Sequence, residues 1–264
     1  MRILISILLF SSFCQSQNIA IYLWGQSNMC GKCSLAVQPD LFVVNSTPRI
    51  NNLQIYNGSD FVNYNITNSD NPAQNSVTGI ELTLAYDLIK RNLYDTVFVI
   101  KYAKSGAPLN NGSYGAGSWN VARLADLWAA CAIYFRAAKL DLTIHNIDTS
   151  IVIGWEGETD ANNQTWTNNL QNNYENIIDS LRAATSDATI PHYIINIDSN
   201  ITSTYKYQVQ VILQTIATQP NNYIISSDAY PCADGSHLAC VDYYDFGIKI
   251  SRIIFPNKKY EVLK

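Results

Sequence analysis

The chain has 264 residues and a net charge of −4, and 47% of its residues are hydrophobic. This apolar content excludes a disordered chain. Basic residues do not outnumber acidic ones, with 17 Lys and Arg against 21 Asp and Glu. This argues against a nucleic-acid partner, because phosphate binding needs a concentrated basic surface. Only 14% of the residues are charged and 28 are Asn, which indicates a neutral, hydrogen-bonding surface. Such a surface suits a neutral partner such as a sugar, although a biased genome explains the Asn content equally well.

Residues 1–17 have the pattern of a secretory signal peptide. One positive charge precedes a short apolar run, and small and polar residues follow, which indicates cleavage near Ser16 or Gln17. The run is too short to span a membrane, and no later segment is long enough without polar interruption. We therefore expect a secreted or extracytoplasmic monomer with one domain over residues 18–264. Lipidation at Cys14 is an alternative, although the residue before it is a poor match for the small residue required.

Five cysteines follow the predicted signal peptide, so at least one thiol is unpaired within the chain. Cys232 and Cys240 bracket a short loop, and in an oxidising compartment we expect them to form a disulfide. Cys30 and Cys33 have the spacing of a redox motif, and a structural bond from one of them to Cys131 is equally compatible with the sequence. Six Asn-x-Ser/Thr sequons would carry glycans in a eukaryotic source: Asn45, Asn57, Asn65, Asn111, Asn163 and Asn200.

Apolar runs of strand length alternate with helical patterns along the chain. The predicted strands are residues 18–24, 96–103, 150–154, 193–197 and 223–226. The predicted helices are residues 79–92, 118–140, 163–184, 202–218 and 243–254. This alternation predicts βαβ units and an α/β fold whose parallel sheet is covered on both faces. Residues 40–76 are rich in Asn and Ser and strand-like only at 53–56, so we expect a surface excursion near the ligand mouth.

Polar motifs follow the predicted strands, and ligands of open parallel sheets bind beyond the carboxyl ends of the strands. Ser27 follows the first strand, Gly106 the second and Glu156 the third, while Asp234 and His237 follow the last. These residue types are the components of acyl transfer, namely a nucleophile, a base held by a carboxylate, and donors for an oxyanion. A serine needs a base to accept its proton, and a histidine serves when an aspartate fixes its tautomer.

These motifs resemble those of the sialate O-acetylesterase-like domain, a group that includes carbohydrate esterase family 6 and belongs to the SGNH hydrolase superfamily. Residues 25–31 (GQSNMCG) match the block GQSNMxG of that group. Four further blocks follow in family order: 79–81 (GIE), 100–106 (IKYAKSG), 157–160 (GETD) and 234–238 (DGSHL). The resemblance implies a three-layer α/β/α sandwich of flavodoxin-like type with a central parallel sheet. It implies no cofactor and no metal.

The resemblance also implies roles for single residues. Ser27 corresponds to the nucleophile, His237 to the general base and Asp234 to its orienting carboxylate. The backbone N–H groups of Ser27 and Gly106 correspond to oxyanion donors, and a glycine lets the backbone approach a substrate closely. Gln26, Asn28, Glu158 and Asp160 are expected to shape the site. The alternative is that Ser27 and His237 are an ordinary turn serine and loop histidine.

Glu156 departs from the family pattern, which reads W-x-Q-G-E-x-D where this chain has GWEGETD at 154–160. It occupies the position of a Gln whose side chain donates to the oxyanion. An ionised carboxylate has no donor, and loss of one oxyanion donor costs about 10²–10³ in kcat. Three explanations are open. Burial keeps Glu156 protonated, the side chain points away, or the chain has lost much of its catalysis and kept sugar binding.

The leading hypothesis is a secreted serine esterase that removes O-acetyl groups from a carbohydrate, either acetylated sialic acid or a plant or microbial glycan, through an acyl-enzyme. The first alternative is a catalytically weakened carbohydrate-binding relative. A thiol–disulfide protein using Cys30 and Cys33 is a second. A glycosidase using Glu158 and Asp160 would leave the serine, histidine and aspartate motifs unexplained.

Overall fold

The computed structural model describes residues 17–31, 52–64, 71–73, 78–110, 117–122, 126–230 and 232–256. The predicted signal peptide (except Gln17), Cys14, Cys33 and the sequons at Asn45, Asn65 and Asn111 lie outside these residues. Within the described part, seven strands form one sheet in the order β3-β2-β4-β1-β5-β6-β7. They are β1 Asn18–Gly25, β2 Leu53–Tyr56, β3 Phe61–Asn63, β4 Thr96–Ala103, β5 Thr149–Trp155, β6 His192–Asn196 and β7 Asn222–Ser226. All neighbouring strands are parallel except β2 and β3.

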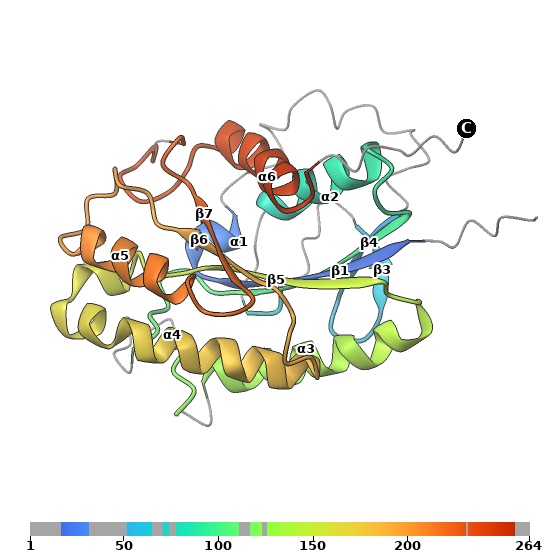
Figure 1. Cartoon of the computed structure of the whole chain (residues 1–264), viewed down its shortest axis with the longest axis horizontal. Coiled ribbons are helices and arrows are strands. Elements are labelled where there is room, and N and C mark those ends of the chain that lie inside the picture. Colours follow the sequence, from blue (N-terminus) through green and yellow to red (C-terminus); the bar gives the residue numbers. More distant parts are fainter. Residues whose placement is uncertain are drawn as a thin grey trace, which may run out of the picture.

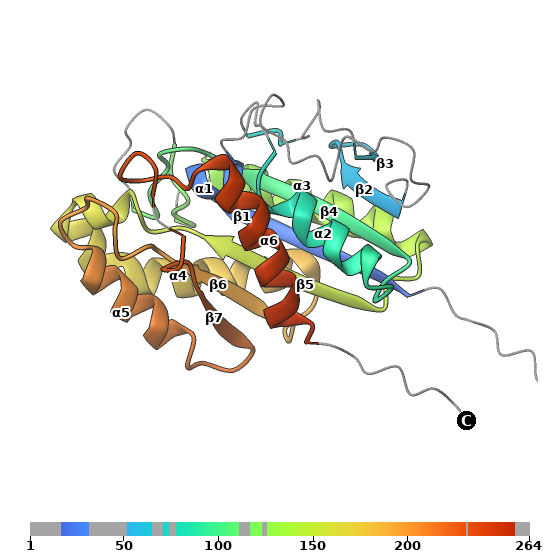
Figure 2. The same ribbon diagram turned by 90° about the horizontal axis from the view of Figure 1, so that it is seen from above.

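Helices cover both faces of the sheet, which confirms the predicted α/β sandwich (Figure 1). The helices on one face are α2 Ile80–Lys90 and α6 Cys240–Ile254, which run side by side (Figure 2). Those on the other face are α3 Leu127–Asp141, α4 Gln164–Thr185 and α5 Lys206–Ile216. Strand β1 is apolar from residue 19 to residue 24 because Ile19, Ile21 and Leu23 pack on the first layer, while Tyr22 and Trp24 pack on the second. Among the described residues, no helix has the length and hydropathy that a membrane span requires.

One predicted helix begins later than its sequence pattern indicates. The pattern favoured residues 118–140, but α3 begins at Leu127. Asp126 is the N-cap, and its Oδ1 accepts hydrogen bonds from the backbone N–H groups of Leu127 and Ser118, both at 2.9 Å. Trp119 is fully buried although it precedes the helix. It is a core residue in a loop, and its apolar side chain made the helical pattern look longer than the helix is.

The excursion predicted over residues 40–76 contributes strands to the sheet. Residues 53–56 form β2, parallel to β4, and β3 pairs with β2 as an antiparallel strand. Strand β3 has only three residues, too few to show the alternation that predicts a strand.

The expected disulfide between Cys232 and Cys240 is not formed. The backbone pairs Cys232 with Leu238 across the turn, and its thiol lies 3.6 Å from Asp198 Oδ2. A bond between Cys30 and Cys131 is also not formed, because these cysteines lie in cores on opposite faces of the sheet.

Candidate active site

The sheet brings three motif loops together at its carboxyl edge. Gly25, the last residue of β1, is in register with Ala103 at the end of β4 and with Trp155 at the end of β5. The first residues of the loops then bond across the strands, because Lys104 N donates to Gly25 O (2.9 Å) and Gln26 N to Trp155 O (3.1 Å). Gly25 has φ +142°, and a Cβ there would overlap the Trp155 carbonyl. A glycine is therefore required where the loop turns away from the sheet.

Ser27 begins the four-residue helix α1, Ser27–Cys30, and is 8% exposed. The residues on either side of it are held by one buried carboxylate. Glu158 Oε2 accepts a hydrogen bond from Gln26 Nε2, and its Oε1 accepts one from Asn28 Nδ2 at 2.7 Å. Thr159 Oγ1 in turn donates to Gln26 Oε1. Three residues expected to shape the site thus contact one another around Ser27.

His237 and Asp234 form a hydrogen-bonded turn near the surface. Their Nδ1 and Oδ2 atoms are 2.7 Å apart, and Asp234 Oδ1 accepts from the backbone N–H of His237 (2.8 Å) and of Ser236 (3.0 Å). Slight burial raises the pKa of Asp234, but the hydrogen bonds from His237 and Ser236 outweigh it and lower that pKa to about 2. Asp234 is therefore a carboxylate at neutral pH. In the tautomer in which Nδ1–H donates to this carboxylate, Nε2 is left as the proton acceptor.

Asn28 connects the serine to the histidine turn. Its Nδ2 donates to Ser236 O (3.1 Å), and its Oδ1 accepts from Leu238 N (3.4 Å). The residue next to Ser27 is therefore bonded to both chain neighbours of His237. Tyr243 in α6 also donates to Asn28 Oδ1, at 2.6 Å. Sequence reasoning missed Tyr243, because nothing distinguishes it from the other buried residues of an amphipathic helix.

Gly106 lies in the turn after β4 with φ +72°, and no described atom lies within 4 Å of the position of a Cβ. Glycine is favoured here by the backbone conformation rather than by crowding. The same loop is held by Asp160, whose Oδ2 accepts from Leu109 N at 3.0 Å. Burial raises the pKa of Asp160 to about 7, against the hydrogen bond from Leu109.

Glu156 is fully buried, and its surroundings favour the protonated form. Its Oε1 accepts from the N–H of Gly157 at 3.3 Å, whereas Oε2 has no hydrogen-bond partner in the described part of the chain. Burial raises the pKa of Glu156 well above its usual range, and the nearby carboxyl groups of Asp160 and Glu158 raise it further. A neutral Glu156 carries one O–H donor, which an ionised Glu156 lacks.

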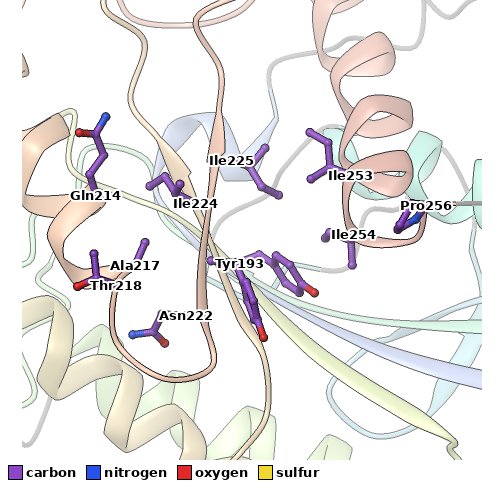
Figure 3. A pocket seen from close by; sticks show the side chains of 11 residues that line it. Tyr193, Gln214, Ala217, Thr218, Asn222, Ile224, Ile225, Ile253, Ile254 and Pro256 are labelled. Carbon is purple, nitrogen blue, oxygen red and sulfur yellow. The ribbon is translucent and has the colours of Figure 1, made fainter.

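An apolar pocket of about 550 Å³ lies along the open edge of the sheet, apart from these loops (Figure 3). Strands β6 and β7 and the ends of α5 and α6 form it, with Tyr193, Ile225 and Ile254 in its lining. The described lining contains no serine, histidine or carboxylate. The residues that the sequence motifs single out as candidates for acyl transfer therefore lie at the strand ends and not in this pocket.

Comparison with known proteins identifies relatives of the whole fold. A protein from Arabidopsis thaliana is similar with a TM-score of 0.70 and 15% identity, over 91% of this chain and 99% of that one. A carbohydrate acetylesterase from Xanthomonas citri is similar with a TM-score of 0.62 and 14% identity, over 89% of this chain and 55% of that one. At these identities the likeness shows a shared fold. No curated protein sequence matches this chain significantly.

A family model described as carbohydrate esterase, sialic acid-specific acetylesterase, matches residues 17–255. The match includes all five motif blocks and confirms the resemblance that they predicted. Because it extends over most of the chain, the protein belongs to the sialic acid-specific acetylesterase family of carbohydrate esterases and is an ester hydrolase.

Proposed function

We propose that this protein is a secreted serine esterase that removes acetyl groups from carbohydrate hydroxyls, with Ser27 as nucleophile, His237 as base and Asp234 as orienting carboxylate. The observation that carries the proposal is a pair of hydrogen bonds: Asn28 Nδ2 donates to Ser236 O, and Leu238 N donates to Asn28 Oδ1. These bonds hold the serine loop against the turn that presents the histidine. An ordinary turn serine would not need this connection to a His–Asp pair.

The reaction proceeds in two transfers of the acetyl group. His237 Nε2 accepts the proton of the Ser27 hydroxyl while Oγ bonds to the carbonyl carbon of the acetyl ester. The intermediate then expels the sugar oxygen, which receives that proton from His237, and an acetyl-serine is left. Water repeats the sequence, releases acetate and restores the serine. The Asp234 carboxylate stabilises the imidazolium that forms in each transfer.

The oxyanion of each intermediate is held by the backbone N–H groups of Ser27 and Gly106 together with the protonated carboxyl of Glu156. A carboxylic acid kept neutral by an apolar site donates a hydrogen bond at neutral pH, as an amide does. The unpartnered, buried Oε2 supports this role for Glu156. It favours an active enzyme over a weakened carbohydrate-binding relative.

The substrate is an acetylated carbohydrate, either acetylated sialic acid or a plant or microbial glycan. The family description and the acetylesterase from Xanthomonas citri support this class, and a surface with only 14% charged residues suits a neutral glycan. The thiol–disulfide alternative is disfavoured because Cys30 is buried and burial raises the pKa of its thiol to about 11. A protonated, shielded thiol is a poor nucleophile. The predicted signal peptide supports secretion.

Acetate release from O-acetylated sialic acid, acetylated xylan and p-nitrophenyl acetate tests the proposal. We expect turnover of p-nitrophenyl acetate and of at least one sugar ester, and its loss in Ser27→Ala. Ser227→Ala is the matched control, because Ser227 is also a buried serine but donates to Asn196 O and contacts no motif residue through its hydroxyl, and it keeps most of the turnover. A folded protein that binds sugars but releases no acetate would instead be the carbohydrate-binding relative.

A further inference from the structure

A fully buried ion pair lies beneath the helix that carries Ser27. Lys101 in β4 and Glu81 in α2 approach to 2.9 Å between Nζ and Oε1, and both side chains are 0% exposed. Removing two charges from water is costly, and a buried pair is tolerated only when further hydrogen bonds satisfy it. The partners of this pair therefore indicate why it is present. Both residues belong to motif blocks, GIE and IKYAKSG, in which only Gly106 has a part in the proposed reaction.

The additional partner of Lys101 is the helix α1 itself. Lys101 Nζ donates to the carbonyl oxygen of Cys30 at 2.8 Å, and Cys30 is the last residue of the helix that begins at Ser27. Carbonyls in the last turn of a helix have no partner within the helix, and a positive charge is favourable there. The ammonium group of Lys101 thus holds the end of α1 opposite to Ser27.

Glu81 connects this anchor to the start of α2 and to Tyr64, the residue after β3. Its Oε1 also accepts from Gly79 N (3.0 Å) and from the hydroxyl of Tyr64 (3.2 Å). Gly31, directly after α1, packs against the same region, because a Cβ at Gly31 would crowd the backbone of Thr78 and Gly79. The ion pair therefore joins β4, the start of α2 and the end of α1 in one buried cluster.

We infer that Lys101 and Glu81 are positioning residues for Ser27, an inference that rests on the proposed function of Ser27. Helix α1 has only four residues, too few to hold its own geometry. Glu158 holds Gln26 and Asn28 at the start of the helix, and the Lys101–Glu81 pair holds its end. Loss of the pair allows α1 to shift and misplaces the Ser27 hydroxyl relative to His237.

The test removes the pair without leaving one charge buried. In Lys101→Met with Glu81→Gln, we expect kcat for p-nitrophenyl acetate to fall about 10- to 100-fold with KM little changed, because small misplacements of reacting groups have effects of this size. Amide hydrogen exchange of residues 27–31 should also become faster relative to the rest of the protein.

The matched control is Asp87→Asn with Arg91→Met. Asp87 in α2 and Arg91, the residue that ends this helix, form an ion pair of 2.8 Å. Their other side-chain contacts are with the C-terminal end of α6, at Ser251, Arg252 and Phe255. This control should lower the melting temperature while kcat and the exchange of residues 27–31 stay at the wild-type values. A purely structural role of the Lys101–Glu81 pair predicts the same behaviour in both double variants.

Three results would overturn the inference. The first is unchanged kcat with unchanged amide exchange in the Lys101–Glu81 variant, and the second is an equal loss of kcat in the control. The third is amide exchange that becomes faster throughout the protein to the same extent as in residues 27–31. If that variant does not fold, Tyr64→Phe takes its place, since it removes one donor to Glu81 and keeps both charges; wild-type kcat and exchange would then reject the inference. If the wild-type protein releases no acetate at all, the proposed function fails, and the exchange of residues 27–31 decides the inference by itself.

Discussion

The serine side and the histidine side of the candidate site are held in different ways. Ser27 is nearly buried, and its helix is anchored by Glu158 and Lys101, which come from two other strands or strand-end loops. The side chains of His237 and Asp234 are 19% and 57% exposed, and the hydrogen bonds that the Asp234 carboxylate accepts come from within residues 234–237. The serine side depends on contacts between distant segments, and the histidine side depends mainly on its own turn. Substitutions on the serine side should therefore affect both stability and the reaction, and substitutions on the histidine side the reaction alone.

The largest expected effect is on the histidine side. His237→Ala should lower kcat by about 10⁴-fold or more, because the serine loses its base, while the melting temperature stays close to the wild-type value because the side chain is partly exposed. Hydrolysis of p-nitrophenyl acetate and thermal unfolding measure the two quantities. His145→Ala, which lies in no motif, is the control and should keep its kcat. A marked loss of stability in His237→Ala would remove the difference between the two sides.

Asn28→Ala breaks the connection between the sides and should combine both kinds of effect. Asn28 is buried and bonds to Glu158, Ser236, Leu238 and Tyr243. We expect kcat to fall about 10- to 100-fold through misplacement and the free energy of unfolding to fall by about 1–3 kcal/mol through unsatisfied buried partners. Urea unfolding and steady-state kinetics measure them.

Asn222→Ala is the control for this change, since Asn222 is also buried but lies on β7 and bonds to Arg182 and Ile216. It should lose stability and keep kcat. If Asn28→Ala loses only stability as well, Asn28 does not align the two sides.

The same difference explains what the sequence could predict. Ser27, Gly106, Glu156 and His237 were placed at one edge because each follows a strand, and parallel strands end at the same edge of a sheet. The local spacing of Asp234 and His237 likewise indicated their pairing. Both inferences rest on short-range patterns.

The anchors of the serine side were beyond prediction because they join residues far apart in the chain. Tyr243 reaches Asn28 across 215 positions, and Lys101 reaches Cys30 across 71. The local spacing of apolar and polar residues carries no information about such contacts. The prediction of a disulfide between Cys232 and Cys240 was wrong for a related reason, because closeness in sequence does not by itself bring two thiols into bonding geometry.

Glu156→Gln tests whether the buried side contributes a donor to the reaction. The pKa of Glu156 is raised by burial and by Asp160 and Glu158, so the donating form is lost as the pH rises through that pKa. We expect the variant to have a somewhat higher kcat at neutral pH and to keep its activity at alkaline pH, where the wild type loses up to about 10²–10³-fold with its donor. The pH dependence of kcat measures the change. Identical profiles would place the Glu156 side chain outside the oxyanion hole.

The smallest expected effect on activity belongs to Asp160, where burial acts on stability instead. Its pKa rises from 3.8 to about 7 on folding, so between these pH values the folded protein holds a proton that the unfolded chain has released. The free energy of unfolding therefore decreases as the pH rises through this range, by at most about 4 kcal/mol.

Asp160→Asn should remove most of this decrease. The amide oxygen still accepts from Leu109 N, and the amide nitrogen replaces the oxygen that has no hydrogen-bond partner among the described residues. Urea unfolding of both proteins at pH 5, between the two pKa values, and at pH 8, above both of them, measures the decrease. The kcat of the variant should change little because the Gly106 loop keeps its anchor. An equally steep pH dependence in the variant would show that the loss of stability arises from another group. In that case the burial of Asp160 would not lower the free energy of unfolding at neutral pH.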